Sequence, residues 1–65
     1  MRPNRMKEIR ARERITQFGL AVKTSITQGR LSYYENGLII PRDDEKQRIA
    51  NALNVKIDEI FPEEK

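Results

Sequence analysis

The feature that most constrains the fold is a pair of short helical segments joined by a turn of only about three residues. Thr16 precedes the first segment, at 17–24, and Thr27 begins the second. A threonine hydroxyl in either place caps free N–H groups of a first helical turn. Asn36-Gly37 ends the second segment, because both residue types tolerate a left-handed backbone. Two helices joined this tightly have to cross steeply, so the core must form around their crossing.

Each of the two segments carries one inward face. Leu20, Ala21 and Thr24 share a face of the first segment at helical spacing, and Leu31 and Tyr34 share a face of the second. Ala21 is small where the two helices approach each other. Ile26, in the turn between them, is predicted to fill the space where the two helices meet.

Further helices are predicted on both sides of this pair. Helical spacing of Met6, Ile9 and Arg10 predicts a first helix from about Asn4 to Arg14, with Asn4 as its cap. At the other end of the chain, a single-turn helix is predicted to close the core before Pro62. Its apolar residues are Val55, Ile57, Ile60 and Phe61.

The remaining helix follows an extended connection, because Pro41 keeps the residue before it out of the helical region. Asp43 or Asp44 is predicted to cap this helix, with Gln47 completing an approximate capping box from Asp44. Asn54 is predicted to end it in the left-handed conformation. Its apolar face comprises Ile49, Ala50 and Leu53.

With 65 residues the chain is long enough for one domain, predicted over 1–65 with a core at about 4–61. It has no Cys and no His, so we expect no disulfide, metal or other cofactor, and no evident small-molecule ligand. Self-association is then the remaining way to add stability. The absence of Cys, of a membrane-length apolar run and of a signal-peptide pattern predicts a cytoplasmic protein without a membrane partner.

Charge is divided unevenly along the chain. Residues 1–30 carry eight Lys and Arg against two Glu, a net charge of +6, whereas residues 31–65 carry five against eight acids, a net charge of −3. A basic half attracts phosphates, and an acidic half would face away from DNA. A highly charged chain can also simply be soluble, so charge alone leaves a nucleic-acid partner undecided.

A set of residues with fixed spacing points to a family. They are Thr16, Gln17, Leu20, Ala21, Ile26, Thr27, Leu31, Ser32, Glu35, Asn36, Gly37, Pro41, Ile49, Ala50, Ala52, Leu53, Val55 and Asp58-Glu59-Ile60-Phe61. At these positions the chain resembles the phage-repressor, or Xre-type, helix-turn-helix family. The resemblance implies an all-α fold, a compact five-helix lambda-repressor-like bundle whose second and third helices form the helix-turn-helix.

In such proteins the third helix enters the major groove. Carried over by position, and with the inward stripe of that helix excluded, the base-contacting residues are Gln28, Gly29, Ser32 and Tyr33. Gln28 is the leading reader, because its amide can donate to and accept from one adenine edge. Tyr33 is expected to contact either a thymine methyl group or a phosphate. The alternative is that these are solvated residues on a helix surface.

The resemblance also implies contacts to the DNA backbone. The candidate phosphate-contacting residues are Gln17, Thr27, Arg30, Asn36 and Arg42. Gln17 resembles a family glutamine that binds a phosphate and braces the first reader. The four base-contacting residues form the reading face of the third helix. Arg30 lies one position off this face, so a contact with phosphate is favoured over a contact with guanine. For Arg42, contact with phosphate or the minor groove and a solvated position are equally open.

Two charged residues are predicted to serve the structure in the first place, rather than to contact DNA. Some family members pair the positions of Arg10 and Glu35 in a partly buried bridge between the first and third helices, and we predict that pair here. Ser25 departs from the family because it replaces the usual turn glycine, which adds strain if the position needs positive φ. Gly29 departs as well, since a glycine inside a short helix costs about 1 kcal/mol relative to alanine.

These observations predict a sequence-specific regulator of transcription, more often a repressor than an activator, that binds a double-stranded operator as a homodimer. Ile57, Ile60, Phe61 and the segment 38–40 are the candidate dimer patch, with plain core favoured for Ile57 and Ile60. The alternative is a protein-interaction module, such as an antitoxin or adaptor, that uses the acidic half or the Tyr33-Tyr34 surface. An enzyme is disfavoured, because the chain lacks His, Cys and a glycine-rich phosphate loop.

Overall fold

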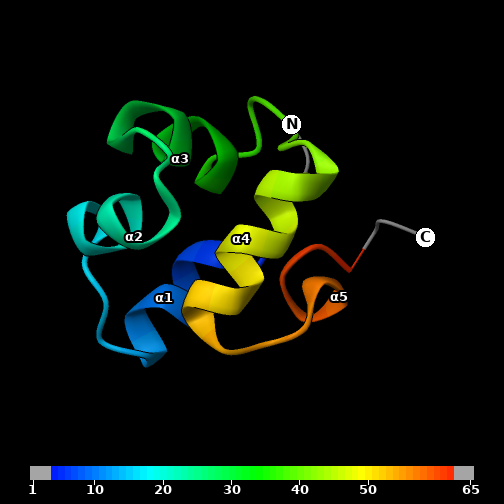
Figure 1. Ribbon diagram of the computed structural model, residues 1–65. Coiled ribbons are helices and arrows are strands. Elements are labelled where there is room, and N and C mark those ends of the chain that lie inside the picture. Colours follow the sequence, from blue (N-terminus) through cyan, green and yellow to red (C-terminus); the bar gives the residue numbers. More distant parts are fainter. Residues whose placement is uncertain (1–3, 63–65) are drawn as a thin grey trace.

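The computed structural model describes residues 4–62, and all regular structure in this range is helical (Figure 1). The elements are α1 (Met6–Arg12), α2 (Gln17–Thr24), α3 (Gln28–Glu35), α4 (Asp43–Leu53) and α5 (Ile57–Ile60). The all-α, five-helix bundle expected from the sequence is therefore confirmed over the part of the chain described.

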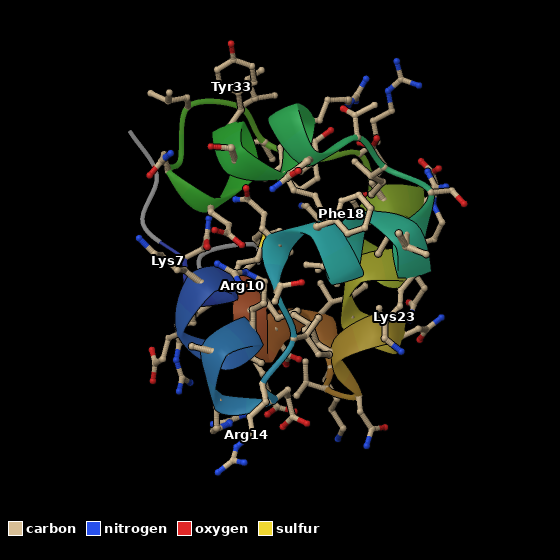
Figure 2. All side chains as sticks on the ribbon, turned by 90° about the vertical axis from the view of Figure 1, so that its left-hand side faces the viewer. Lys7, Arg10, Arg14, Phe18, Lys23 and Tyr33 are labelled. Atoms are coloured by element: carbon tan, nitrogen blue, oxygen red, sulfur yellow. The ribbon has the colours of Figure 1, made fainter. Side chains whose placement is uncertain are left out.

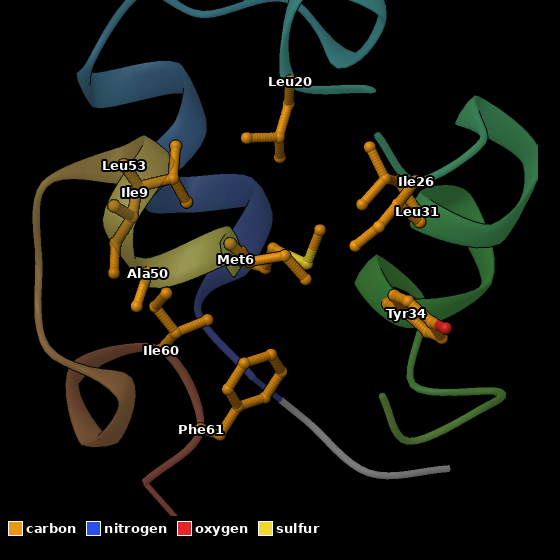
Figure 3. Close-up of a cluster of buried hydrophobic side chains, with 11 residues drawn as sticks. Met6, Ile9, Leu20, Ile26, Leu31, Tyr34, Ala50, Leu53, Ile60 and Phe61 are labelled. Atoms are coloured by element: carbon orange, nitrogen blue, oxygen red, sulfur yellow. The ribbon is translucent and has the colours of Figure 1, made fainter. Parts of the chain in front are cut away.

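Helix α4 runs through the middle of the bundle, with α2 and α3 on one side and α5 on the other (Figure 1). Helix α2 packs against both α3 and α4, α1 packs against α3, and α5 packs against α4. Apolar side chains from all five helices and from the turn converge between them (Figure 3). The buried core comprises Met6, Ile9, Leu20, Ile26, Leu31, Tyr34, Ile49, Ala50, Leu53, Ile60 and Phe61.

The two central helices begin where the threonines predict. Thr16 Oγ1 accepts a hydrogen bond from the N–H of Gly19 at 2.9 Å, and Thr27 Oγ1 accepts from the N–H of Arg30 at 3.2 Å. Each hydroxyl satisfies one N–H that the helix itself leaves free. Both predicted caps are confirmed.

The turn between α2 and α3 has the left-handed backbone that a glycine would favour. Ser25 adopts φ 61° and ψ 27°, so this departure from the family carries the expected strain. Local hydrogen bonds support the turn. The Thr24 hydroxyl donates to Leu20 O at 2.8 Å, and Arg48 of α4 donates from Nη1 to Thr24 O at 3.0 Å. The arginine thereby satisfies a free carbonyl at the C-terminus of α2.

Helix α1 is shorter than predicted at both ends. Arg14 takes a left-handed backbone with φ 59°, which turns the chain toward α2 and stops the helix at Arg12. Asn4 lies just outside the helix. Its Oδ1 accepts from the N–H of Met6 at 2.9 Å and its Nδ2 donates to Tyr34 O at 2.8 Å. The asparagine therefore caps from one residue further out and ties α1 to α3.

The cap predicted for α4 is wrong. Arg42 is the extended residue before the helix, and Asp43 and Asp44 lie exposed in its first turn. Glu45 reaches back instead, accepting from the backbone N–H of Arg42 at 3.1 Å. A carboxylate at the third helical position satisfies that N–H and is stabilised by the positive end of the helix dipole. At the other end, Asn54 has φ 61°, as predicted.

Of the candidate dimer patch, the plain core favoured for Ile60 is confirmed, and the expectation that Phe61 is exposed is corrected. Ile60 and Phe61 are 0% and 5% exposed, because α5 turns them into the core against α4, and Ile57 is partly buried beside them. Neither Ile60 nor Phe61 can belong to an exposed surface. The segment between α3 and α4 remains open to solvent, with Leu38, Ile39 and Ile40 exposed by 60%, 48% and 45%.

Candidate nucleic-acid interface

The outer side of α3 displays the residues predicted to face DNA. Gln28, Gly29 and Tyr33 are exposed, and Ser32 is half-buried. Tyr33 projects away from the rest of the molecule (Figure 2). Tyr34, its neighbour in sequence, has its ring in the core, so the two tyrosines do not form a common surface. The helical period therefore separates the inward and outward residues of α3 as the sequence predicts.

Gly29 leaves an open place on this side. A Cβ atom built on it would meet nothing within 4 Å, and its φ is not positive. Neither packing inside the chain nor backbone geometry requires a glycine here. Because Gly29 has no side chain, another molecule can approach the backbone of α3 closely beside Gln28.

A chain of polar side chains connects the reading face to α1. Gln28 Nε2 donates to Gln17 Oε1 at 3.3 Å, and Gln17 Nε2 donates to Glu35 Oε1 at 3.3 Å. Gln17 lies in the first turn of α2, so it bridges the two ends of α3. The hydrogen bond to Gln17 favours one orientation of the exposed Gln28 side chain.

Glu35 in turn pairs with Arg10 of α1. Arg10 Nε donates to Glu35 Oε2 at 2.6 Å and Nη2 donates to Oε1 at 3.4 Å, while Nη1 donates to Ile15 O at 3.0 Å. The side chains of Arg10 and Glu35 are only 15% and 4% exposed. The two residues that the resemblance paired thus meet in a largely buried bridge that fixes α3 on α1.

Arg30 has partners that the sequence did not indicate. Its guanidinium lies against the Tyr34 hydroxyl, with Nη2 at 2.7 Å, and Nη2 also donates to Glu45 Oε2 of α4 at 2.9 Å. The Tyr34 hydroxyl donates to Glu45 Oε1 at 2.7 Å. The four-residue spacing of Arg30 and Tyr34 on one helix is a local signal for their contact. Glu45 is far along the chain, and only the fold brings it to them.

Burial and hydrogen bonding act in opposite directions on Glu45. Burial raises the pKa of Glu45, but the Tyr34 hydroxyl, the Arg42 amide and the Arg30 cation together outweigh it and hold that pKa below 4.5. Burial and the neighbouring carboxylate raise the pKa of Tyr34 above 10.0. At neutral pH the pair is therefore an ionised carboxylate and a neutral phenol.

The other candidate phosphate contacts lie at the two ends of α3. Thr27 precedes the helix and its hydroxyl serves as the cap, while Asn36 follows it, with Nδ2 donating to Ser32 O at 3.0 Å. The Arg42 side chain is exposed beyond the connecting segment. An eight-residue helix is about 12 Å long. Thr27 and Asn36 thus flank the outer side of α3 at its two ends.

Basic side chains extend from this face along the side of the molecule formed by α1 and α2, where Figure 2 shows Lys7, Arg14 and Lys23. Exposed acids lie on this side too, at Glu8 and Glu13, and in the first turn of α4, at Asp43 and Asp44. Within residues 4–62, no cluster of potential metal ligands occurs and no helix is both long and apolar enough to cross a bilayer.

Two short helices crossing at a tight turn, with a polar outer face on the second, define a helix-turn-helix domain. The sequence profile of the helix-turn-helix family, of the Xre or lambda-repressor-like type, matches residues 6–60. The chain belongs to this family of DNA-binding regulators. No curated protein and no solved structure matches the chain significantly.

Proposed function

We propose that this protein binds double-stranded DNA sequence-specifically and regulates transcription, with α3 in the major groove. Repression is favoured over activation, because occupying an operator requires only a DNA-binding surface. The observation that carries the proposal is the orientation of Gln28 at the start of α3, linked through Gln17 to the buried Arg10–Glu35 pair. A reader with a favoured orientation loses less conformational entropy on binding.

Gln28, Gly29, Ser32 and Tyr33 are the proposed base-contacting residues. Gln28 would pair with the N6 and N7 edge of an adenine, and Gly29 would let the backbone approach the neighbouring base. Gln17, Thr27, Arg30, Asn36 and Arg42 are the proposed phosphate contacts, and they fix the register of α3 without reading sequence.

A homodimer on a two-fold operator fits the size of the fold. Half-sites one helical turn apart place two reading helices about 34 Å from each other. The Cα positions extend 27 × 21 × 20 Å, and side chains enlarge each dimension, so two adjacent copies come within reach of contact. We propose the exposed segment Leu38–Ile40, next to the end of α3, as the dimer contact.

The test is to select duplexes from a random pool with the purified chain and to measure the affinity of the winner. Replacing Gln28 with alanine should weaken that affinity by about 1 to 3 kcal/mol and relax the preference at one base pair. An unchanged affinity and base preference in the Gln28→Ala variant would exclude Gln28 as a reader. Sedimentation with and without the winning duplex tests the dimer.

A second candidate function is a protein-interaction module on the same fold. Exposed apolar side chains on the outer face of α2, Phe18 and Val22, each 65% exposed, favour it. Salt titration separates the two functions. Binding to duplexes that weakens steeply with salt and ranks sequences supports the regulator, and no binding at low salt supports the interaction module.

A further inference from the structure

The side chain of Arg30 crosses from the reading helix to the start of α4. Its Nε and Nη2 donate to the Tyr34 hydroxyl at 3.0 and 2.7 Å, and Nη2 donates to Glu45 Oε2 at 2.9 Å. The hydroxyl of Tyr34 lies at the end of the ring that faces away from the buried cluster (Figure 3). Half of the Arg30 side chain is exposed, whereas the Glu45 side chain is 8% exposed. An interior carboxylate thus holds a surface cation.

Glu45 is itself fixed on two sides. Its Oε1 accepts from the Tyr34 hydroxyl at 2.7 Å and from the Arg42 backbone N–H at 3.1 Å. The carboxylate therefore has a defined position relative to both α3 and α4. Because the guanidinium is a rigid planar fork, two contacts on one of its edges set the direction of the other edge.

That other edge remains available. Within residues 4–62, the Nη1 of Arg30 has no hydrogen-bond partner, although Nε and Nη2 do. Arg30 lies in the first turn of α3, next to Gly29 and the proposed reader Gln28. A donor with a set direction beside the reading face suits a phosphate oxygen.

We propose that Glu45 is a positioning residue for DNA binding, which holds the Arg30 guanidinium so that its Nη1 edge meets a DNA phosphate. The inference rests on the proposed function. It predicts the opposite sign from simple electrostatics, under which removing any negative charge from the protein raises its affinity for DNA. Without Glu45, the entropy cost of ordering the Arg30 side chain offsets most of what the phosphate contact contributes, so the contact is largely lost and the affinity falls.

The experiment compares two substitutions that each remove one negative charge. Glu45→Gln removes the charged acceptor of Arg30 and leaves it the neutral Tyr34 hydroxyl. Asp44→Asn changes the preceding residue, which is 71% exposed and contacts Arg48 only at 3.5 Å. Affinity for the duplex that the wild-type chain selects from a random pool is measured over a salt series, with helicity checked by circular dichroism. We expect Glu45→Gln to bind on the order of tenfold more weakly, and Asp44→Asn to bind as well as the wild type or better.

The salt series separates positioning from lost stability. If Arg30 leaves its phosphate, the slope of log affinity against log salt becomes shallower by about one contact in Glu45→Gln. A partly unfolded variant would lose affinity without a change of slope. Adding Glu45→Gln to an Arg30→Met variant should cause no further loss, because the carboxylate acts through that arginine.

Arg30→Lys provides a second test should Glu45→Gln fold poorly. Lysine keeps the charge but lacks the fork, so it should reproduce the loss of affinity. Wild-type affinity in Arg30→Lys, or equal affinities of Glu45→Gln and Asp44→Asn, overturns the positioning role alone. Failure of the wild-type chain to bind any duplex at low salt overturns the proposed function and the role of Glu45 with it.

Discussion

Two arginine–carboxylate pairs connect α3 to its neighbouring helices, and they differ in their exposure to water. Arg10 and Glu35, on the α1 side, are 15% and 4% exposed, whereas Arg30 and Glu45, on the α4 side, are 48% and 8% exposed. In the first pair all three nitrogens of the guanidinium donate to groups within the protein. In the second, Nε and Nη2 of Arg30 donate, and Nη1 has no hydrogen-bond partner among residues 4–62. We therefore expect the first pair to contribute chiefly to stability, and we propose that the second contributes chiefly to binding.

The largest effect is expected from breaking the α1-side pair. Arg10→Met leaves the Glu35 carboxylate buried without its cation and should lower the free energy of unfolding by about 3 to 5 kcal/mol. Urea denaturation measures it. The double variant Arg10→Met with Glu35→Leu should recover most of the loss, since no charge is then stranded. A loss below about 1 kcal/mol would show that water reaches Glu35.

Breaking the α4-side pair should cost less stability. In Arg30→Met, Glu45 keeps its hydrogen bonds from the Tyr34 hydroxyl and the Arg42 amide, and the arginine removed was already half solvated. We expect a distinctly smaller fall in the urea midpoint than in Arg10→Met, together with a loss of DNA affinity. Equal falls in the two variants would remove the distinction between the pairs.

A substitution at Gly29 separates stability from DNA binding without changing either arginine–carboxylate pair. Gly29→Ala should stabilise the fold by about 1 kcal/mol, because alanine favours the helix and its Cβ meets no other atom. Its affinity for the selected duplex should fall if the backbone approaches a base there. Gly19→Ala is the matched control, since its Cβ would lie 3.1 Å from Thr16 Oγ1 and disturb the cap. A Gly29→Ala variant that binds as tightly as the wild type would remove the proposed close approach.

The smallest effect is the pH dependence of stability that the α4-side pair contributes. The pKa of Glu45 is lowered, so its contribution to stability is complete above pH 4.5 and is lost as pH falls through the lowered value. The pKa of Tyr34 is raised, so its contribution is present below pH 10.0 and is lost as pH rises through the raised value. Thermal melting from acid to alkaline pH should show both losses. Glu45→Gln should reduce the acid one, and identical profiles would contradict the assignment.

Local features of this chain were the most predictable. The caps at Thr16 and Thr27 act on N–H groups three residues ahead, so a short stretch of sequence contains both partners. The helical period likewise separates Tyr34 in the core from Tyr33 on the surface. The prediction from local sequence failed at the start of α4. Three adjacent acids lie there, at Asp43, Asp44 and Glu45, and it is Glu45 that accepts the hydrogen bond from the N–H before the helix.

The candidate site was predictable as a set of positions and as two of its contacts, the Gln17 brace on Gln28 and the Arg10–Glu35 bridge. The link from Gln17 to Glu35, which joins these two contacts, was not predicted. Gln17, Gln28 and Glu35 were named from the resemblance, and the structure joins them into one chain of hydrogen bonds. Their roles toward DNA stay predictions. The pairing of Arg30 with Glu45 was not predicted. In a chain with so many charged residues, two charges far apart in the sequence give no sign that they contact each other.

By itself the sequence determined the number of helices, the ends of α2 and α3, and which side of α3 faces outward. These depend on helical period and on side chains a few residues apart. Only the tertiary structure decided that α1 stops at Arg12, that Phe61 enters the core and that Glu45 is buried beneath Arg30. Each of these depends on which distant segment packs alongside, because burial and charge pairing are properties of assembled helices.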